Sequence, residues 1–189
     1  MDKVFVLDFG SQYTQLIARK IRELGVYSEI LPYNTSLSAI KKGKPSALIL
    51  SGGPQSVYEK KAPIPAKGIL DLGIPVLGIC YGLQLMARLL GGKVSPSQKR
   101  EYGFATLHVK EKSDFLSGLK SNSQVWMSHG DRVNEVPGGF CVTGRTENCE
   151  ATVIEWAERK FFGVQFHPES IITEEGYALL NNFCMLPSG

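Results

Sequence analysis

One cysteine of this chain stands where it could act as a nucleophile. Cys80 is the centre of Gly-Ile-Cys-Tyr-Gly (78–82), with an apolar run before it and a helical pattern, 83–90, after it. A strand, Gly-x-Cys-x-Gly and a helix form the cysteine version of a nucleophile elbow. Such a turn lifts the sulfur above a sheet at a helix N-terminus, where a thiolate is stabilised. The alternative is a buried structural cysteine, because free cysteines are often buried.

A cysteine nucleophile needs a base, and the base needs a group that orients it. His167 follows the apolar, strand-like run 161–165, and Glu169 stands two residues further on, across a proline. Both side chains could therefore point to the same side, with the carboxylate holding the imidazole tautomer. His108 lies in a strand-like segment, where a surface role is favoured, and His129 lies in a turn-like segment. The pattern favours His167 as the base.

Acyl chemistry also needs donors for an oxyanion. The backbone N–H of the residue after an elbow nucleophile, here Tyr81, is one such donor. The loop Ser-Gly-Gly-Pro (51–54) follows another apolar run and could supply the second donor at Gly53. A tight turn without a ligand is the alternative for this loop.

The elements that must position these residues alternate in the first half of the chain. We expect strands at 3–8, 26–31, 47–51 and 76–79, and helices at 12–24, 37–42, 66–72 and 83–90. The second half reads as short strands at 104–109, 124–127, 140–144, 151–156 and 161–165, then a helix with Thr173 as its N-cap. The pattern predicts an α/β fold in one domain, 1–189. An open, mostly parallel sheet is flanked by helices and has a mixed or antiparallel extension.

Composition limits the function classes. The chain has 189 residues, 43% of them hydrophobic, and a net charge of +3, which is too small to imply nucleic-acid binding. Its four cysteines have no C-x-x-C spacing, so neither a zinc site nor a redox motif is indicated. No signal peptide or membrane-spanning run is evident, so we expect a cytoplasmic protein with no membrane partner.

Together, the Cys80 elbow, the Gly-Val-Gln-Phe-His-Pro-Glu segment (163–169) and the Ser-Gly-Gly-Pro loop resemble the class I (triad) glutamine amidotransferases. The resemblance covers essentially the whole chain and implies their flavodoxin-like, three-layer architecture. Segments at 6–13, 51–58, 100–103 and 127–131 resemble the amidotransferase part of the GMP synthases. The segment 169–173 departs from that pattern and is closer to the amidotransferase component of anthranilate synthases.

The resemblance implies a reaction. Cys80 attacks the carboxamide of glutamine to form a γ-glutamyl thioester, and His167, oriented by Glu169, moves the protons. The oxyanion is held at Gly53 and Tyr81. The residues expected to bind glutamine are Gly52, Gln84, Ser128, His129 and Asp131. Among these, Ser128 and His129 act through their backbone, and Asp131 pairs with the ammonium group.

The ammonia is expected to serve an ATP-pyrophosphatase domain or subunit that converts XMP to GMP. That part would carry Ser-Gly-Gly-x-Asp-Ser, whereas this chain has Gln55 in place of the aspartate, and it has no Walker A motif. We therefore expect no cofactor or metal in this chain, with ATP and Mg²⁺ on the partner. We also expect low activity without the partner, with His167 on a loop away from Cys80.

Three alternatives remain at this point. The same glutaminase could serve anthranilate or aminodeoxychorismate synthesis. A γ-glutamyl peptidase would share the cysteine–histidine logic. A non-catalytic scaffold that kept the fold would need no triad at all.

Overall fold

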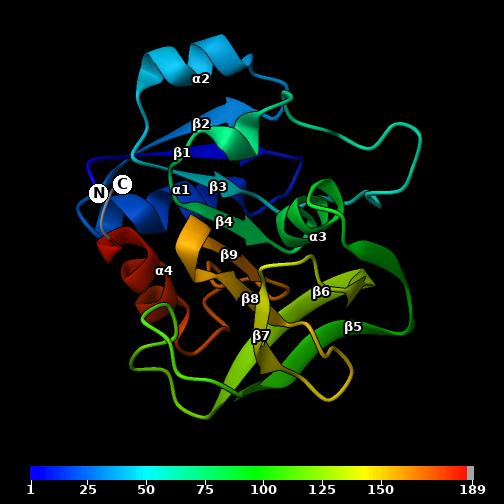
Figure 1. Ribbon diagram of the computed structural model, residues 1–189. Coiled ribbons are helices and arrows are strands. Elements are labelled where there is room, and N and C mark those ends of the chain that lie inside the picture. The colour runs from blue at the N-terminus through cyan, green and yellow to red at the C-terminus, as the bar shows by residue number, and fades with distance from the viewer. Residues whose placement is uncertain (187–189) are drawn as a thin grey trace.

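A computed structural model describes residues 1–186, apart from the side chains of 98–100. Within that part of the chain, the strands form one nine-stranded sheet in the order β2-β1-β3-β4-β9-β8-β7-β5-β6 (Figure 1). The strands are β1 (Lys3–Asp8), β2 (Tyr27–Pro32), β3 (Ala47–Leu50), β4 (Val76–Ile79), β5 (Lys93–Val109), β6 (Asn122–Glu135), β7 (Cys141–Arg145), β8 (Val153–Trp156) and β9 (Phe161–Val164). The predicted α/β class is confirmed.

Five neighbouring strands, β2, β1, β3, β4 and β9, are parallel. Their apolar residues alternate between two cores, because successive side chains on a strand point to opposite faces. On β1, Val4 and Val6 enter one core, and Phe5 and Leu7 enter the other. Because β4 and β9 are adjacent and parallel, the residues that follow them, Cys80 and the 165–169 segment, emerge at the same edge of the sheet.

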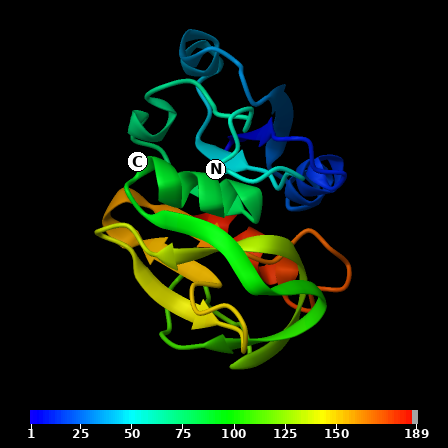
Figure 2. The ribbon, with the colours of Figure 1, turned by 90° about the vertical axis from the view of Figure 1, so that its right-hand side faces the viewer.

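Helices cover both faces of this parallel region (Figure 2). The helices α1 (Thr14–Glu23) and α4 (Gly176–Met185) pack on one face, and α2 (Leu37–Gly43) and α3 (Tyr81–Leu89) pack on the other. Two residues of α3, Leu83 and Ala87, also pack against Val133 and Ile154 of the antiparallel strands. The helix that begins at the elbow therefore joins the two halves of the sheet.

The antiparallel half is built on the long β5–β6 hairpin, with β7 and β8 linking it to β9. Both hairpin strands are longer than the sequence predicts. The segment that contains His129 reads as a turn in the sequence, but it belongs to β6 and pairs with Glu101 of β5. A register irregularity between Pro96 and Glu101 bends the hairpin there.

Two helix predictions are wrong in detail. The helix expected at 66–72 is reduced to one 3-10 turn, η1 (Ile69–Asp71), because Gly68 adopts a left-handed φ of +84° that an α-helix cannot continue through. The last helix begins at Gly176 rather than after Thr173. The Thr173 hydroxyl donates to the carbonyl of His167 at 2.7 Å instead, so it supports the predicted catalytic loop.

The first and last described elements meet. The Met1 amino group, just before β1, donates to the carbonyl of Cys184 in α4 at 3.2 Å. No helix among the described residues is both long and apolar enough to cross a membrane.

Candidate active site

The turn at Cys80 has the strained geometry of an elbow. Cys80 has φ +52° and ψ −106°, a backbone conformation that non-glycine residues rarely adopt. The flanking glycines are required by close packing: a Cβ on Gly78 would lie 2.7 Å from the Gly82 backbone, and one on Gly82 would lie 2.2 Å from the Leu50 carbonyl oxygen. The Gly-x-Cys-x-Gly pattern therefore follows from sterics, with the sulfur at the start of α3.

His167 and Glu169 form a buried pair beside this sulfur. His167 Nδ1 lies 2.7 Å from Glu169 Oε1, and the two residues are 4% and 0% exposed. Burial alone would lower the pKa of His167, but hydrogen bonds with Cys80 and Glu169 and the charges of both partners outweigh burial and raise it to about 10. The arrangement thus favours an imidazolium that faces Cys80.

The loop that carries His167 is fixed from several sides. Its backbone N–H donates to the Trp126 carbonyl at 3.1 Å, and the Trp126 N–H donates to Thr173 Oγ1 at 3.2 Å. The Tyr13 ring meets the imidazole edge-on, with 5.1 Å between ring centroids. Our expectation that His167 would lie away from Cys80 does not match this structure, in which both residues line the same cavity and a Cβ on Gly52 would lie within 4 Å of both side chains.

The two predicted oxyanion donors, Gly53 and Tyr81, line the same cavity as Cys80. Tyr81 is the first residue of α3, and its hydroxyl donates to the Pro63 carbonyl at 2.8 Å. Burial raises the pKa of this phenol to about 12. Gly53 lines the same cavity, and a Cβ there would lie 2.6 Å from the Phe9 carbonyl oxygen. Both positions therefore bring backbone, rather than a reactive side chain, to the cavity wall.

These residues line a cavity of about 500 Å³. The predicted glutamine ligand Asp131 lies in its wall, where its carboxylate accepts hydrogen bonds from the hydroxyls of Ser56 and Tyr58. Gln84 lines the cavity as well, and its amide nitrogen donates to the Asp131 carbonyl at 3.0 Å. A carboxylate and an amide thus line the same cavity as Cys80, as recognition of a small amino acid requires.

Comparison with known families places this geometry in context. Residues 5–186 match the family model "Glutamine amidotransferase class-I". The chain belongs to the class I glutamine amidotransferases. It is 51% identical to a GMP synthase [glutamine-hydrolyzing] of Gloeothece citriformis over 95% of its length, and 53% identical to that of Campylobacter lari over 95%. These matches cover 33% and 35% of the relatives, so the chain spans about a third of their length.

A solved structure agrees with the fold. A protein of Thermoplasma acidophilum, described as one subunit of a GMP synthase, superimposes with a TM-score of 0.86 at 29% identity. The superposition covers 97% of this amidotransferase and 92% of that chain. The mixed sheet and its helices are therefore those of a known amidotransferase fold.

The remaining predicted glutamine ligands of this amidotransferase lie in two places. Gly52 is beside the triad, since a Cβ there would lie 3.1 Å from His167 Cε1 and 3.7 Å from Cys80 Cβ. Ser128 turns its carbonyl towards Cys80 Sγ, at 3.6 Å. The His129 side chain points elsewhere: its Nε2 lies 3.1 Å from Glu101 Oε2 and its Nδ1 lies 2.7 Å from the Asp131 carbonyl oxygen.

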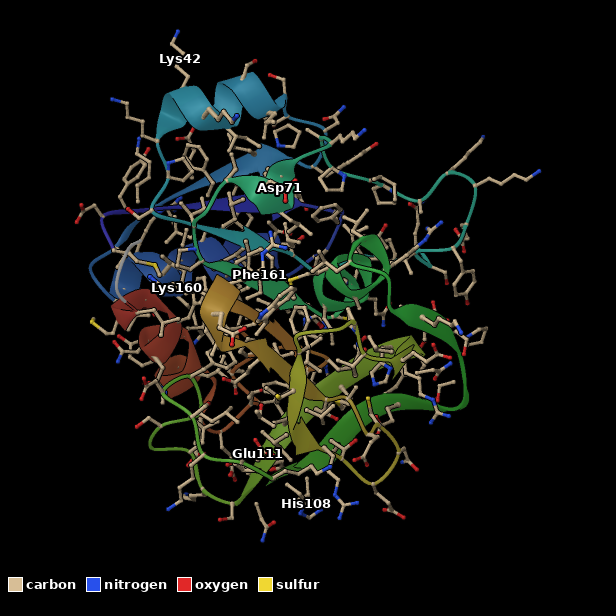
Figure 3. All side chains as sticks on the ribbon, in the orientation of Figure 1. Lys42, Asp71, His108, Glu111, Lys160 and Phe161 are labelled. Atoms are coloured by element: carbon tan, nitrogen blue, oxygen red, sulfur yellow. The ribbon has the colours of Figure 1, made fainter. Side chains whose placement is uncertain are left out.

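The third histidine is remote from the triad. Figure 3 shows His108 near Glu111, on the side of the molecule opposite to Lys42 of α2, and His108 lies in β5, one residue before its end. Its Nδ1 pairs with Asn122 Oδ1 at 2.7 Å. Among the residues that the structure describes, no group of three histidine, cysteine or acidic side chains could hold a metal ion.

One buried residue of the site, Gln165, is not among those predicted from the sequence. Gln165 is 0% exposed, and its Nε2 lies 3.6 Å from Cys80 Sγ. A signal for it was available, because Gln165 and His167 are two residues apart at the end of a strand and so share a face.

Proposed function

We propose that this chain hydrolyses L-glutamine to glutamate and ammonia, as the ammonia-producing part of a GMP-forming enzyme. The observation that supports it most is the position of Cys80, beside the buried His167–Glu169 pair and in the wall of a cavity of about 500 Å³. Pockets of this size accommodate small metabolites.

In the first half of the reaction, Cys80 Sγ attacks the carboxamide carbon of glutamine and a C–S bond forms. The N–H groups of Gly53 and Tyr81 hold the oxyanion. The C–N bond then breaks, and the imidazolium of His167 gives its proton to the leaving nitrogen. Ammonia and a γ-glutamyl thioester are the products, and His167 is left neutral.

In the second half, neutral His167 takes a proton from water, and the resulting hydroxide attacks the thioester. The C–S bond breaks, so the Cys80 thiolate and the His167 imidazolium are both restored. The new carboxylic acid loses its proton to solvent. Glu169, at 2.7 Å from Nδ1, keeps Nε2 directed at the reacting atoms throughout.

The substrate is held at its amino acid end. We assign the ammonium group to the carboxylate of Asp131, and we assign backbone contacts to Ser128, His129 and Gly52. The NH₂ group of Gln84 is used inside the protein, so its carbonyl oxygen is the atom that faces a ligand.

The ammonia acceptor is proposed to be an ATP-pyrophosphatase domain or subunit that binds ATP and Mg²⁺ and aminates XMP, with no cofactor in this chain. The relatives, of which this chain spans about a third, support a larger assembly. Two aromatic side chains support docking of that part at the cavity: Tyr102, 66% exposed, lines it, and Phe104, 65% exposed, follows on the same face of β5. We propose a cytoplasmic location.

The decisive experiment pairs the purified chain with an XMP-specific ATP pyrophosphatase. We expect glutamine-dependent GMP formation, and glutaminase activity that is low alone and rises when the partner, XMP and ATP are added. Phe104→Ser, outside the cavity wall, should weaken this stimulation while leaving the basal hydrolysis unchanged. Support of chorismate amination instead would overturn the assignment of the acceptor, an alternative that the GMP synthase relatives do not favour.

Two further measurements separate the remaining alternatives. A γ-glutamyl peptidase would cleave γ-glutamyl peptides in preference to free glutamine. A non-catalytic scaffold would not react with a glutamine-like electrophile, whereas we expect covalent labelling of Cys80, detected by mass spectrometry.

A further inference from the structure

Gln165 is completely buried and contacts the sulfur, yet the reaction described above assigns it no part. Its backbone N–H donates to the Thr152 carbonyl at 2.8 Å, which fixes the chain just after β9. Its side-chain Oε1 accepts from Gln84 Nε2 at 3.1 Å, and its Nε2 lies 3.6 Å from Cys80 Sγ. Both ends of this amide are therefore engaged.

The orientation of the amide follows from its neighbours. The Asp131 carbonyl oxygen can only accept hydrogen bonds, so Gln84 must turn its NH₂ group towards it. The same NH₂ group also donates to Gln165, which must therefore accept with its side-chain carbonyl oxygen. The remaining end of the Gln165 amide, the NH₂ group, then faces the sulfur. The Asp131 carbonyl and Gln84 thus determine that the NH₂ group of Gln165, and not its oxygen, faces Cys80.

The far end of this chain of hydrogen bonds is itself anchored. The Asp131 carbonyl also accepts from His129 Nδ1, at 2.7 Å, and His129 Nε2 lies 3.1 Å from Glu101 Oε2. Because both ring nitrogens face oxygens, one proton must lie between Nε2 and the carboxylate. Thr146 Oγ1 donates to Glu101 as well. A buried pair thus keeps the Asp131 carbonyl in place.

The N–H donor of Gln165 interacts differently with the thiolate and the thiol forms of Cys80. A thiolate accepts from it, whereas a thiol offers a proton, for which the available acceptor is the Ser128 carbonyl at 3.6 Å. We propose that Gln165 is a further catalytic residue, whose amide N–H, oriented by Gln84 and the Asp131 carbonyl, stabilises the thiolate of Cys80. The proposal rests on the proposed glutaminase reaction, in which the contact between Gln165 Nε2 and Cys80 Sγ would stabilise the attacking thiolate.

The test measures the thiolate directly and needs no glutamine. The rate of Cys80 alkylation by iodoacetamide is followed against pH in the 189-residue chain and in Gln165→Leu. We expect the midpoint of the rate profile to rise by about one pH unit in Gln165→Leu, because a hydrogen bond to the charged form is lost. The ionisable groups around the sulfur, His167 with Glu169 behind it and Asp131 across the cavity, are unchanged.

Two other variants make the result interpretable. Gln84→Met removes the group that orients Gln165 and should raise the midpoint by a smaller amount. Gln15→Leu makes the same chemical change on the exposed side of α1 and should leave the profile unchanged.

A folded Gln165→Leu chain with the wild-type midpoint would overturn the proposal. If that variant does not fold, as judged by circular dichroism, an unchanged midpoint in Gln84→Met overturns it instead. A shifted midpoint in a chain that never hydrolyses glutamine would support the hydrogen bond and reject the glutaminase, so the two proposals fail separately.

Discussion

Two buried histidine–glutamate pairs contribute their histidines to the wall of the same cavity. In one, His167 Nδ1 and Glu169 Oε1 are 2.7 Å apart, and in the other, His129 Nε2 and Glu101 Oε2 are 3.1 Å apart. Each histidine is 4% exposed. The pairs differ in what the second ring nitrogen meets. His167 faces the sulfur of Cys80, whereas His129 faces a backbone carbonyl.

This difference indicates that a buried histidine–carboxylate pair is not in itself a catalytic device. The same pair can hold a backbone in place when its other nitrogen meets a carbonyl, or move a proton when that nitrogen meets a nucleophile. The location in the fold decides between the two. His167 follows a parallel strand at the edge where the elbow also emerges, while His129 lies within the antiparallel hairpin.

The largest expected effect comes from removing Cys80, the nucleophile that the His167–Glu169 pair serves. Cys80→Ala should reduce glutaminase activity by about 10⁴-fold or more, because loss of a nucleophile removes the whole covalent route. Folding should be retained, since only one sulfur atom is lost. Steady-state ammonia release and a thermal melt are the measurements. The exposed Cys141→Ala is the matched control, and residual glutaminase in Cys80→Ala alone would reject the nucleophile assignment.

Substituting each histidine in turn should separate the two pairs more sharply. His167→Ala should lower activity by about 10² to 10⁴-fold, the usual range for a general acid–base. Each substitution leaves a buried glutamate without its histidine, so both should lower the free energy of unfolding by about 3 kcal/mol. His129→Ala should lose much less activity than His167→Ala, because His129 meets a backbone carbonyl and not the sulfur. Urea denaturation and initial rates measured on the same samples decide the matter. An equal loss of activity in the two folded variants would contradict the distinction.

The sequence predicts one of these pairs and not the other for a physical reason. His167 and Glu169 are two residues apart across a proline, so their meeting is a local property of an extended chain. His129 and Glu101 are 28 residues apart, and they meet only because of the β5–β6 register, including its irregularity beside Glu101. Sequence periodicity does not determine that register.

The same difference between local and long-range contacts decides which strands and helices the sequence predicts. The parallel strands are predictable, because buried strands read as continuous apolar runs bounded by turns. The helix predicted at 66–72 is wrong because Gly68 adopts a left-handed conformation, and the N-cap predicted at Thr173 is wrong because its hydroxyl serves the His167 loop. Thr173 thus makes a tertiary hydrogen bond in place of the local N-cap bond that the sequence predicts.

An intermediate effect is expected on the titration of His167. Its pKa is raised to about 10 against burial, partly by the hydrogen bond and charge of Cys80. In Cys80→Ala these two causes vanish while burial remains, so the pKa should fall. NMR titration of the imidazole measures it. An unchanged value would mean that Glu169 alone holds the proton.

The sign of the related stability effect follows by linkage. The unfolded histidine releases its proton near pH 6.5, and the folded one near pH 10. The stabilisation from this proton is therefore complete below about pH 6.5 and is lost as the pH rises towards 10. In Cys80→Ala that loss should occur at lower pH, and denaturation curves across this range test it.

The smallest effect is expected from closer packing between Gly52 and the His167 ring. A Cβ at Gly52 would lie 3.1 Å from His167 Cε1, a contact that the ring can relieve by moving a few tenths of an ångström. Gly52→Ala should therefore fold normally but lower kcat by about 10-fold, since misplacement by about 1 Å can cost about 10²-fold. Gly138→Ala, where a Cβ meets nothing within 4 Å, is the control. If kcat is unchanged in Gly52→Ala, the ring tolerates displacement, and the close packing around His167 is not what sets the rate.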